Sequence, residues 1–338
     1  MKQIMAVYDV DPLYAARLAE VIGRKERTPF EAVAFSSLEK LREFAASHPV
    51  SLLLISEEVG LEEIGLIGAK KVVTLEGGGP EKAQSLYPGV YKYQSSDGLM
   101  REVLACYSET EECAGSFRGG SSRLIGVFSP LGRCGKTSFA ITLGALLARE
   151  GRTLYLTFEP CSGLPALTGE DYRTGLSDLL YFCRQGTYNR LRLDSVIHTM
   201  GGLDYVPPAR YPEDLEWDGE PAGSELLRAV SRDSGYETIV VDAGPFSGDL
   251  LQELDLCQII YMPVEEDRLS LAKVQAFEEY LDQTGNSGLR ARIRRLRLPR
   301  PSCMWETDGC GYPDRLLWSE MGDYVRQLLQ GQDTGRGG

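Results

Sequence analysis

The chain has 338 residues, of which 43% are hydrophobic and 25% are charged, and its formal net charge is −13. This length is enough for two cores of ordinary domain size, and the composition is typical of packed globular proteins. The acidic balance argues against strong nucleic-acid binding, which needs clustered lysine and arginine. The sequence has no apolar run of membrane-span length and no long apolar signal region at its start, and we therefore expect a cytoplasmic protein.

The first hundred residues alternate β-rich runs with helical patterns. Strand-like runs cover residues 3–8, 32–35, 51–55, 71–74 and 89–92, and apolar spacing near 3.6 covers 13–22, 38–44 and 97–106. Such alternation predicts a parallel sheet wrapped by helices. Residues 108–122 then lose apolar periodicity and are rich in small and acidic residues, so we interpret them as a linker between domains.

A second series of strand-like runs covers residues 123–128, 153–156, 203–206, 237–241 and 257–262. These runs are mostly apolar on both faces, as is typical of central parallel strands buried between helices. An amphipathic stretch at 315–329 precedes a short tail, 331–338. The sequence therefore predicts an α/β protein with two doubly wound parallel-sheet domains, residues 1–107 and 123–330.

Residues 130–137 read Pro-Leu-Gly-Arg-Cys-Gly-Lys-Thr and lie between a strand-like run and a helical pattern. This is the context of a P-loop, in which amides at a helix N-terminus converge on phosphates. Lys136 would lie between the β- and γ-phosphates, and the Thr137 hydroxyl would ligate Mg²⁺. Pro130 replaces the usual first glycine, and we expect Gly132 to supply the flexible point instead. The alternative is a Gly-Lys-Thr that merely caps a helix. The predicted binding residues for a purine nucleoside triphosphate are Gly132, Arg133, Cys134, Gly135, Lys136, Thr137 and Ser138.

This loop resembles that of the ParA/MinD group of P-loop ATPases, which reads K-G-G-x-G-K-T. Aligned on the final Gly-Lys-Thr, Leu131 stands where the family has a lysine that reaches the partner's nucleotide across a dimer. Arg133, two positions on, could supply a comparable cation. The resemblance implies ATP and Mg²⁺ as cofactors and a homodimer that forms on ATP.

Two further segments match the same family in order and spacing. Residues 154–160 align with its acidic D-x-D, with Glu159 as the second acid, which orients the attacking water, and Thr157 in place of the first. Residues 236–242 resemble the Walker B strand, which places Asp242 beside the Mg²⁺ shell. The resemblance thus implies Lys136, Glu159 and Asp242 as catalytic residues, and Thr137 and Asp242 as metal ligands. Taken singly, Glu159 could be a solvated acid and Asp242 the start of a turn. Adenine contacts are expected within 263–267 and 292–301.

The N-terminal series resembles a response-regulator receiver, with Asp9, Asp11, Thr74 and Lys92 after its strands. Ser56 stands where receivers carry the aspartate that accepts the phosphoryl group, and Val10 stands where the second acid belongs. We therefore predict no phosphorylation switch of the usual kind. A plain flavodoxin-like domain, with Asp9 and Asp11 in turn and helix-cap roles, is the alternative.

A receiver-like domain followed by such an ATPase resembles the TadZ/CpaE proteins, which position Tad-type pilus assembly machinery at one place in the cell. This resemblance implies a slowly hydrolysing positioning switch that recruits pilus or secretion assembly proteins, at a pole or the inner face of the membrane through its partners. Two alternatives are a phosphoryl-transfer enzyme acting on a small molecule and a non-hydrolysing scaffold that ATP stabilises.

Three remaining features have competing interpretations. A run of six arginines within 290–300 either contacts DNA, lipid or nucleotide, or forms an edge strand with one wet face, which we favour. The amphipathic stretch at 315–329 either resembles the membrane-targeting tail of MinD or docks on the core; its lack of basic bias favours docking. The eight scattered cysteines favour reduced thiols over a zinc site, and Cys134 is interpreted as a small filler rather than an oxidisable thiol.

Overall fold

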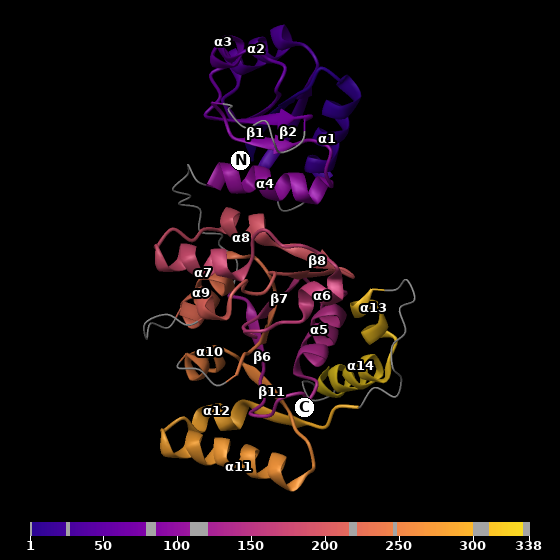
Figure 1. Ribbon diagram of the computed structural model, residues 1–338, viewed down its shortest axis with the longest axis vertical. Helices are drawn as coiled ribbons and strands as arrows, with labels where there is room; N and C mark the ends of the chain where they lie inside the picture. Colours follow the sequence, from indigo (N-terminus) through magenta and orange to yellow (C-terminus); the bar gives the residue numbers. More distant parts are fainter. Residues whose placement is uncertain are drawn as a thin grey trace. The chain divides into compact units, whose positions relative to one another are not determined.

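The computed structural model describes residues 2–24, 28–78, 86–108, 121–215, 222–245, 249–299 and 311–333. The chain divides into two compact units, Met1–Cys113 and Ala114–Gly338, each built around its own sheet (Figure 1). Most of the expected linker, residues 109–120, lies outside the described residues, as do the tail from 334 and residues 300 and 301. The predicted α/β class with two parallel sheets is confirmed.

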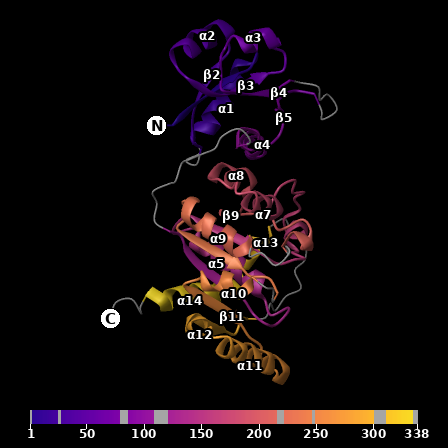
Figure 2. The ribbon, with the colours of Figure 1, turned by 90° about the vertical axis from the view of Figure 1, so that its left-hand side faces the viewer.

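The N-terminal unit contains five parallel strands in the order β2-β1-β3-β4-β5, which is the flavodoxin-like order. Its strands are β1 (Gln3–Tyr8), β2 (Phe30–Phe35), β3 (Val50–Ser56), β4 (Lys71–Glu76) and β5 (Gly89–Tyr91). Its helices are α1 (Pro12–Arg24), α2 (Leu38–Ser47), α3 (Leu61–Gly65) and α4 (Ser96–Ser108). Figures 1 and 2 show α2 and α3 on one side of this sheet and α1 and α4 on the other. Every residue of β3 is buried, as expected for a strand covered on both faces.

The C-terminal unit has a seven-stranded sheet in the order β12-β11-β6-β10-β7-β9-β8. Its strands are β6 (Arg123–Val127), β7 (Thr153–Thr157), β8 (His198–Met200), β9 (Leu203–Tyr205), β10 (Thr238–Asp242), β11 (Ile259–Pro263) and β12 (Ile293–Leu296). All neighbouring strands are parallel except β8 and β9. Gly201 and Gly202 join that pair, and both have positive φ, as a tight two-residue hairpin turn requires. The short strand β8 was not predicted from the sequence.

Helices cover both faces of this sheet. They are α5 (Lys136–Leu147), α6 (Leu164–Thr168), α7 (Leu176–Arg184), α8 (Arg190–Val196), a 3₁₀ turn at Pro212–Leu215, α9 (Ala222–Asp233), α10 (Leu250–Asp255), α11 (Arg268–Gln283), α12 (Ser287–Arg292), α13 (Tyr312–Leu317) and α14 (Glu320–Asp333). One core contains residues of α7, α9, α10 and α11, and a second contains residues of α5, α13 and α14 (Figure 1). Strand residues alternate between these cores: Leu154 and Leu156 face the first, and Tyr155 faces the second.

The C-terminal amphipathic segment docks on the core, as predicted, and does so against α5. Leu317, Met321 and Val325 are buried in the core that α5 shares, and Tyr324 and Leu328 pack against it. The segment forms two helices rather than one, because the Ser319 hydroxyl accepts a hydrogen bond from the Met321 amide (3.2 Å) and starts a new helix. The second helix runs to Asp333, two residues beyond the predicted start of the tail at 331.

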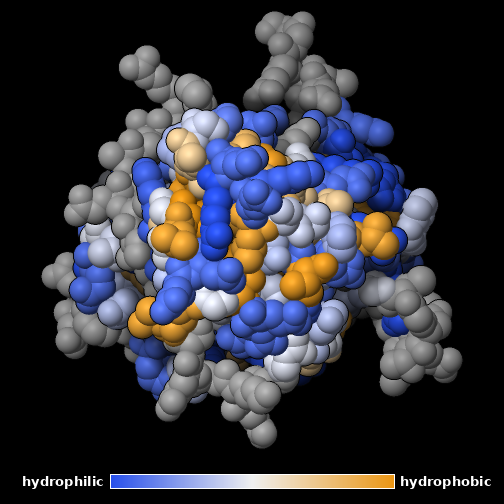
Figure 3. Space-filling view, turned by 90° about the horizontal axis from the view of Figure 1, so that it is seen from above, coloured by the Kyte–Doolittle hydropathy of each residue, from blue (hydrophilic) through white to orange (hydrophobic). Residues whose placement is uncertain are grey.

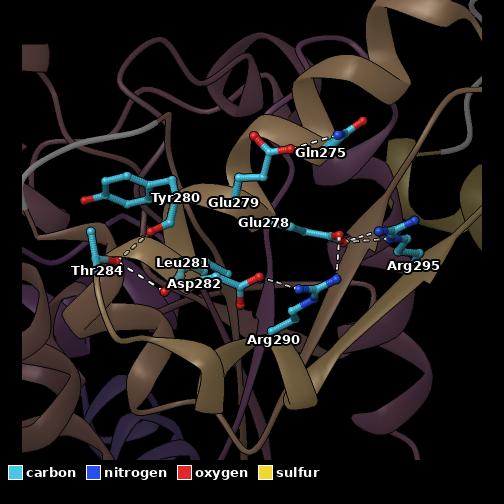
Figure 4. A network of polar contacts seen from close by, with 9 residues as sticks. All are labelled: Gln275, Glu278, Glu279, Tyr280, Leu281, Asp282, Thr284, Arg290 and Arg295. Atoms are coloured by element: carbon cyan, nitrogen blue, oxygen red, sulfur yellow. Dashed lines mark hydrogen bonds and ion pairs between the residues drawn. The ribbon is translucent and has the colours of Figure 1, made fainter.

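The arginine-rich segment includes the edge strand β12, which pairs with β11 alone among the described strands. Figure 4 shows Arg290 between two acids of α11: its guanidinium lies 3.5 Å from Glu278 and 2.5 Å from Asp282. The Arg295 Nε donates to the same Glu278 carboxylate at 2.9 Å. Arg292 pairs with Asp255 at 2.5 Å. The predicted edge strand is confirmed by its pairing with β11, and Arg290, Arg292 and Arg295 of the segment are paired with acids within the fold.

Large apolar side chains are also found at the surface. Figure 3 shows a face on which hydrophobic residues are interspersed with hydrophilic ones. Exposed hydrophobic side chains in the N-terminal unit include those of Val10, Leu13, Leu61, Leu66, Leu86, Tyr91 and Tyr93. Among the described residues, none of the helices combines the length and apolar character that crossing a bilayer requires.

Candidate nucleotide site

The predicted site residues meet at the carboxyl ends of three adjacent strands, β6, β10 and β7. Asp242, the last residue of β10, pairs in register with Val127 on one side and Thr157 on the other. The loop after Val127 and the residues after Thr157 are therefore brought next to Asp242. Ligands of open α/β sheets bind at this edge.

The loop that follows β6 has an unusual backbone. Gly135 precedes α5 with a φ of 82°, which explains the need for glycine there. Arg133 has a φ of 58° and is the one non-glycine residue with positive φ in the described part of the chain. Gly132 is not among the positive-φ glycines, and a Cβ there would meet no atom within 4 Å. Positive φ therefore occurs not at Gly132 but at Arg133, at the position of the family's second glycine.

Two loop side chains are buried rather than directed to a ligand. Leu131 and Cys134 belong to the core that covers the α7 side of the sheet. Burial raises the pKa of the Cys134 thiol, which keeps it protonated and unreactive, in agreement with the filler interpretation. Ser129 fixes the start of the loop, since its hydroxyl donates to the Pro263 carbonyl at 2.7 Å and accepts from the Leu131 amide at 3.2 Å. Leu131 therefore cannot act as the family's lysine does, and Arg133, two positions along the loop, is exposed.

Lys136 begins α5 and is held by two oxygen atoms. Its ammonium lies 3.2 Å from the Glu159 carboxylate and donates to the Ala243 carbonyl at 2.8 Å. The lysine side chain is 11% exposed and that of Glu159 is 35% exposed. The predicted pair of lysine and second acid is thus in direct contact, at the place where the first-turn amides of α5 have no intrahelical acceptor.

Asp242 is fully buried and is held through one oxygen. Its Oδ2 accepts from the Thr137 hydroxyl at 2.7 Å and from the Tyr155 hydroxyl at 3.0 Å. Its Oδ1 is buried and has no hydrogen-bond partner in the described residues. Burial raises the pKa of Asp242, while Lys136 and the two hydroxyl donors oppose that rise. Burial, followed by the Asp242 charge, raises the pKa of Tyr155 well above its ordinary value, so Tyr155 stays a protonated donor.

These donors fit a hard divalent cation. Mg²⁺ takes oxygen ligands, usually one or two from the protein with the rest from phosphates and water. An orphaned carboxylate oxygen on Asp242 beside the Thr137 hydroxyl is such a set. The residues present therefore fit the predicted metal, which would neutralise phosphate charge there.

Sequence reasoning missed several residues of the site. Tyr155 was interpreted only as part of an apolar strand, although a lone hydroxyl within Leu-Tyr-Leu is a signal of a buried hydrogen bond. The Ser138 hydroxyl is 2.8 Å from that of Tyr312, so α13 contacts the start of α5. Leu298, within the range 292–301 expected to approach the nucleotide, does lie near the loop, since a Cβ on Gly135 would be 3.3 Å from it.

A second cluster lies at the carboxyl end of the N-terminal sheet. Asp9 is buried and pairs with the Lys92 ammonium at 3.2 Å. Burial lowers the pKa of Lys92, but its contact with Asp9 outweighs this and the pKa is raised. Asp9 accepts from the Asp11 amide at 2.9 Å, and the Asp11 carboxylate accepts from the Leu13 amide at 2.9 Å. Both acids therefore accept backbone amides, the turn and cap roles of the flavodoxin-like alternative, and Asp9 also pairs with Lys92.

The chain is similar over part of its length to known proteins. No protein-family model matches the chain. The chromosome-partitioning ATPase Soj of Thermus thermophilus is 30% identical over 178 residues, which are 52% of this chain and 67% of that protein. A ParA family ATPase from Chlorobium tepidum is 19% identical, with a TM-score of 0.45 over 53% of this chain and 74% of that one. A plasmid partition protein from Borrelia burgdorferi bound to AMPPNP is 16% identical, with a TM-score of 0.44 over 54% and 76%. By its similarity to Soj and its loop, the chain belongs to the ParA/MinD family of P-loop ATPases.

Proposed function

We propose that this protein is an ATP-dependent positioning switch, which closes as a homodimer on ATP and Mg²⁺ and reopens after slow hydrolysis. One observation carries the proposal: Lys136, Thr137, Glu159 and Asp242 meet at one sheet edge, beside the start of a helix. Phosphate-binding loops use that arrangement of helix amides, lysine and hydroxyl.

Each residue has a role that its contacts support. The Lys136 ammonium would exchange the Glu159 carboxylate for phosphate oxygens, since both are anions. The Thr137 hydroxyl and Asp242 would hold Mg²⁺, and Mg²⁺ would neutralise the triphosphate. The released Glu159 carboxylate would then orient the attacking water. Arg133 is exposed on the loop and would face the nucleotide or the partner subunit.

Slow turnover follows from two departures from the family pattern. Leu131 is buried where the family's lysine would contact the partner's nucleotide, and Thr157 replaces the first acid of the D-x-D segment. A cation that stabilises the charge of the transition state accelerates phosphoryl transfer strongly. A site without it would bind nucleotide more readily than it would hydrolyse it.

The proposal is tested by measuring mass in solution with light scattering after size exclusion. We expect a monomer with ADP and a dimer with ATP or a non-hydrolysable analogue, and we expect Lys136→Ala to stay monomeric with all three. Lys273→Ala, which removes an exposed lysine on α11, is the matched control and should behave as wild type. A wild-type protein that stays monomeric with every nucleotide would show that the dimer is wrong.

We also propose a narrower role, in which the switch recruits a pilus or secretion assembly in the manner of TadZ/CpaE proteins. Support comes from the order of the two units and from Ser56, which ends β3 where a receiver would carry its phosphoacceptor. A fluorescent fusion in the native cell should form one focus, at a pole or the inner face of the membrane, that depends on Lys136. Uniform fluorescence in wild-type cells would contradict this role.

A further inference from the structure

Tyr155 is a buried tyrosine of the candidate site that takes no direct part in the proposed binding of nucleotide. Tyr155 lies in β7, is fully buried and donates its hydroxyl to Asp242 Oδ2 at 3.0 Å. We infer that Tyr155 is a positioning residue that orients the Asp242 carboxylate so that its other oxygen is held toward the metal. The inference rests on the proposed nucleotide and Mg²⁺ site.

The register of the sheet explains how the tyrosine reaches the carboxylate. Asp242 pairs with Thr157, and Val240 pairs with Tyr155, so Tyr155 starts two residues back along the neighbouring strand. Two residues of strand span about 6.6 Å, which a tyrosine side chain can bridge and a shorter hydroxyl residue cannot. Tyr155 faces the α5 side of the sheet, the side from which Thr137 also approaches Asp242.

Two hydroxyl groups hold one oxygen of the Asp242 carboxylate and leave the other oxygen without a partner in the described residues. Both bind Oδ2, one from α5 and one from β7, and Oδ1 is left buried and without a partner in the described residues. A carboxylate held by a single donor can rotate about its Cβ–Cγ bond, whereas donors from two separate elements fix the orientation of the carboxylate plane. Groups that hydrogen-bond a metal ligand usually fix its orientation and strengthen metal binding.

The residue at position 157 increases the importance of the Tyr155 hydroxyl for holding Asp242. Thr157 stands where the family's first acid belongs, and its hydroxyl is engaged by the Glu159 amide at 3.2 Å. The strand therefore brings no carboxylate of its own at that position. Fixing Asp242 through Tyr155 would keep this carboxylate in place while the Thr137 hydroxyl turns from Asp242 toward the metal.

The test is metal affinity in the presence of nucleotide, with Mn²⁺ as a spectroscopic substitute for Mg²⁺. Electron paramagnetic resonance counts the Mn²⁺ bound to the protein with ADP or a non-hydrolysable ATP analogue. We expect Tyr155→Phe to weaken Mn²⁺ binding about tenfold, with nucleotide affinity in EDTA unchanged. Tyr205→Phe is the matched control, because it removes another fully buried hydroxyl of the same sheet, one that contacts Tyr172 instead. It should bind Mn²⁺ as wild type does.

Two results would overturn the role proposed for Tyr155. Wild-type Mn²⁺ affinity in Tyr155→Phe would overturn the inference, and so would an equal loss in both tyrosine variants, which would indicate general loosening. Tyr155→Met also lacks the donor and should show the same loss; it serves if the phenylalanine variant unfolds. A wild-type protein that binds no nucleotide would overturn the proposed function and the inference together, whereas nucleotide binding with unaltered metal affinity overturns the inference alone.

Discussion

Glu159→Gln provides the sharpest test of how the site releases its lysine. In the structure the Glu159 carboxylate lies 3.2 Å from the Lys136 ammonium, and in the proposed function a phosphate would displace it. Two charges at 4 Å attract by about 4 kcal/mol at an effective dielectric constant near 20. Since the Glu159 side chain is 35% exposed, water screens the pair and about 1 kcal/mol is the appropriate figure. Removing this charge should therefore tighten ATP binding about fivefold.

The assay is an equilibrium titration with a fluorescent ATP analogue, together with the rate of phosphate release. We expect Glu159→Gln to bind more tightly and to release phosphate more slowly, because it keeps the shape of the side chain but cannot orient water as an acid does. Glu279→Gln, on the exposed face of α11, should leave both quantities unchanged. If Glu159→Gln binds ATP no better than wild type, the ion pair does not oppose nucleotide. If its phosphate release is unchanged, Glu159 has no part in hydrolysis.

Three further predictions concern stability. Burial and the neighbouring Asp249 raise the pKa of Glu253 from 4.5 to about 8. Between pH 4.5 and pH 8 the folded chain therefore keeps a proton that the unfolded chain loses. The free energy of unfolding should fall by about 4 kcal/mol as the pH rises across this range. Urea unfolding of Glu253→Gln over the same range should show most of that fall removed. Arg133→Val should be less stable than Arg133→Gly by about 1–2 kcal/mol, because a β-branched residue tolerates positive φ poorly; equal unfolding midpoints would refute this. Glu278→Gln should cost about 1–2 kcal/mol in urea unfolding, because the carboxylate pairs with two arginines, whereas Glu279→Gln should cost almost nothing.

The parts of the site that could be predicted from sequence are those that depend on order along the chain. Strand, loop and helix are contiguous around Lys136, and Glu159 and Asp242 each end an apolar run. Because parallel strands end at a common edge, residues that follow them meet there whatever the details of packing. The contact between Lys136 and Glu159 follows from that rule.

The features that could not be predicted depend on register or on local competition. The Tyr155 hydroxyl reaches Asp242 only because β7 and β10 pair with one particular alignment. The strand β8 has three residues, too few for a period to be visible, and its hairpin depends on the two glycines that follow. The break at Ser319 competes with a continuous amphipathic pattern, and the cap is decided by one hydroxyl.

The altered loop has a consistent physical logic. Leu131 contributes to the core at the position where the family resemblance expects a lysine, so the loop has a packed apolar side chain there instead of a cation. Arg133 has a positive φ angle, which is more usual for glycine, and its cationic side chain lies outside the core. Tyr155 adds a neutral donor near a position that has lost an acid. In the proposed mechanism, the changes at Leu131 and Thr157 would remove charge that acts during hydrolysis. Under the proposed function, such a loop would favour a long-lived bound state, as a positioning switch requires.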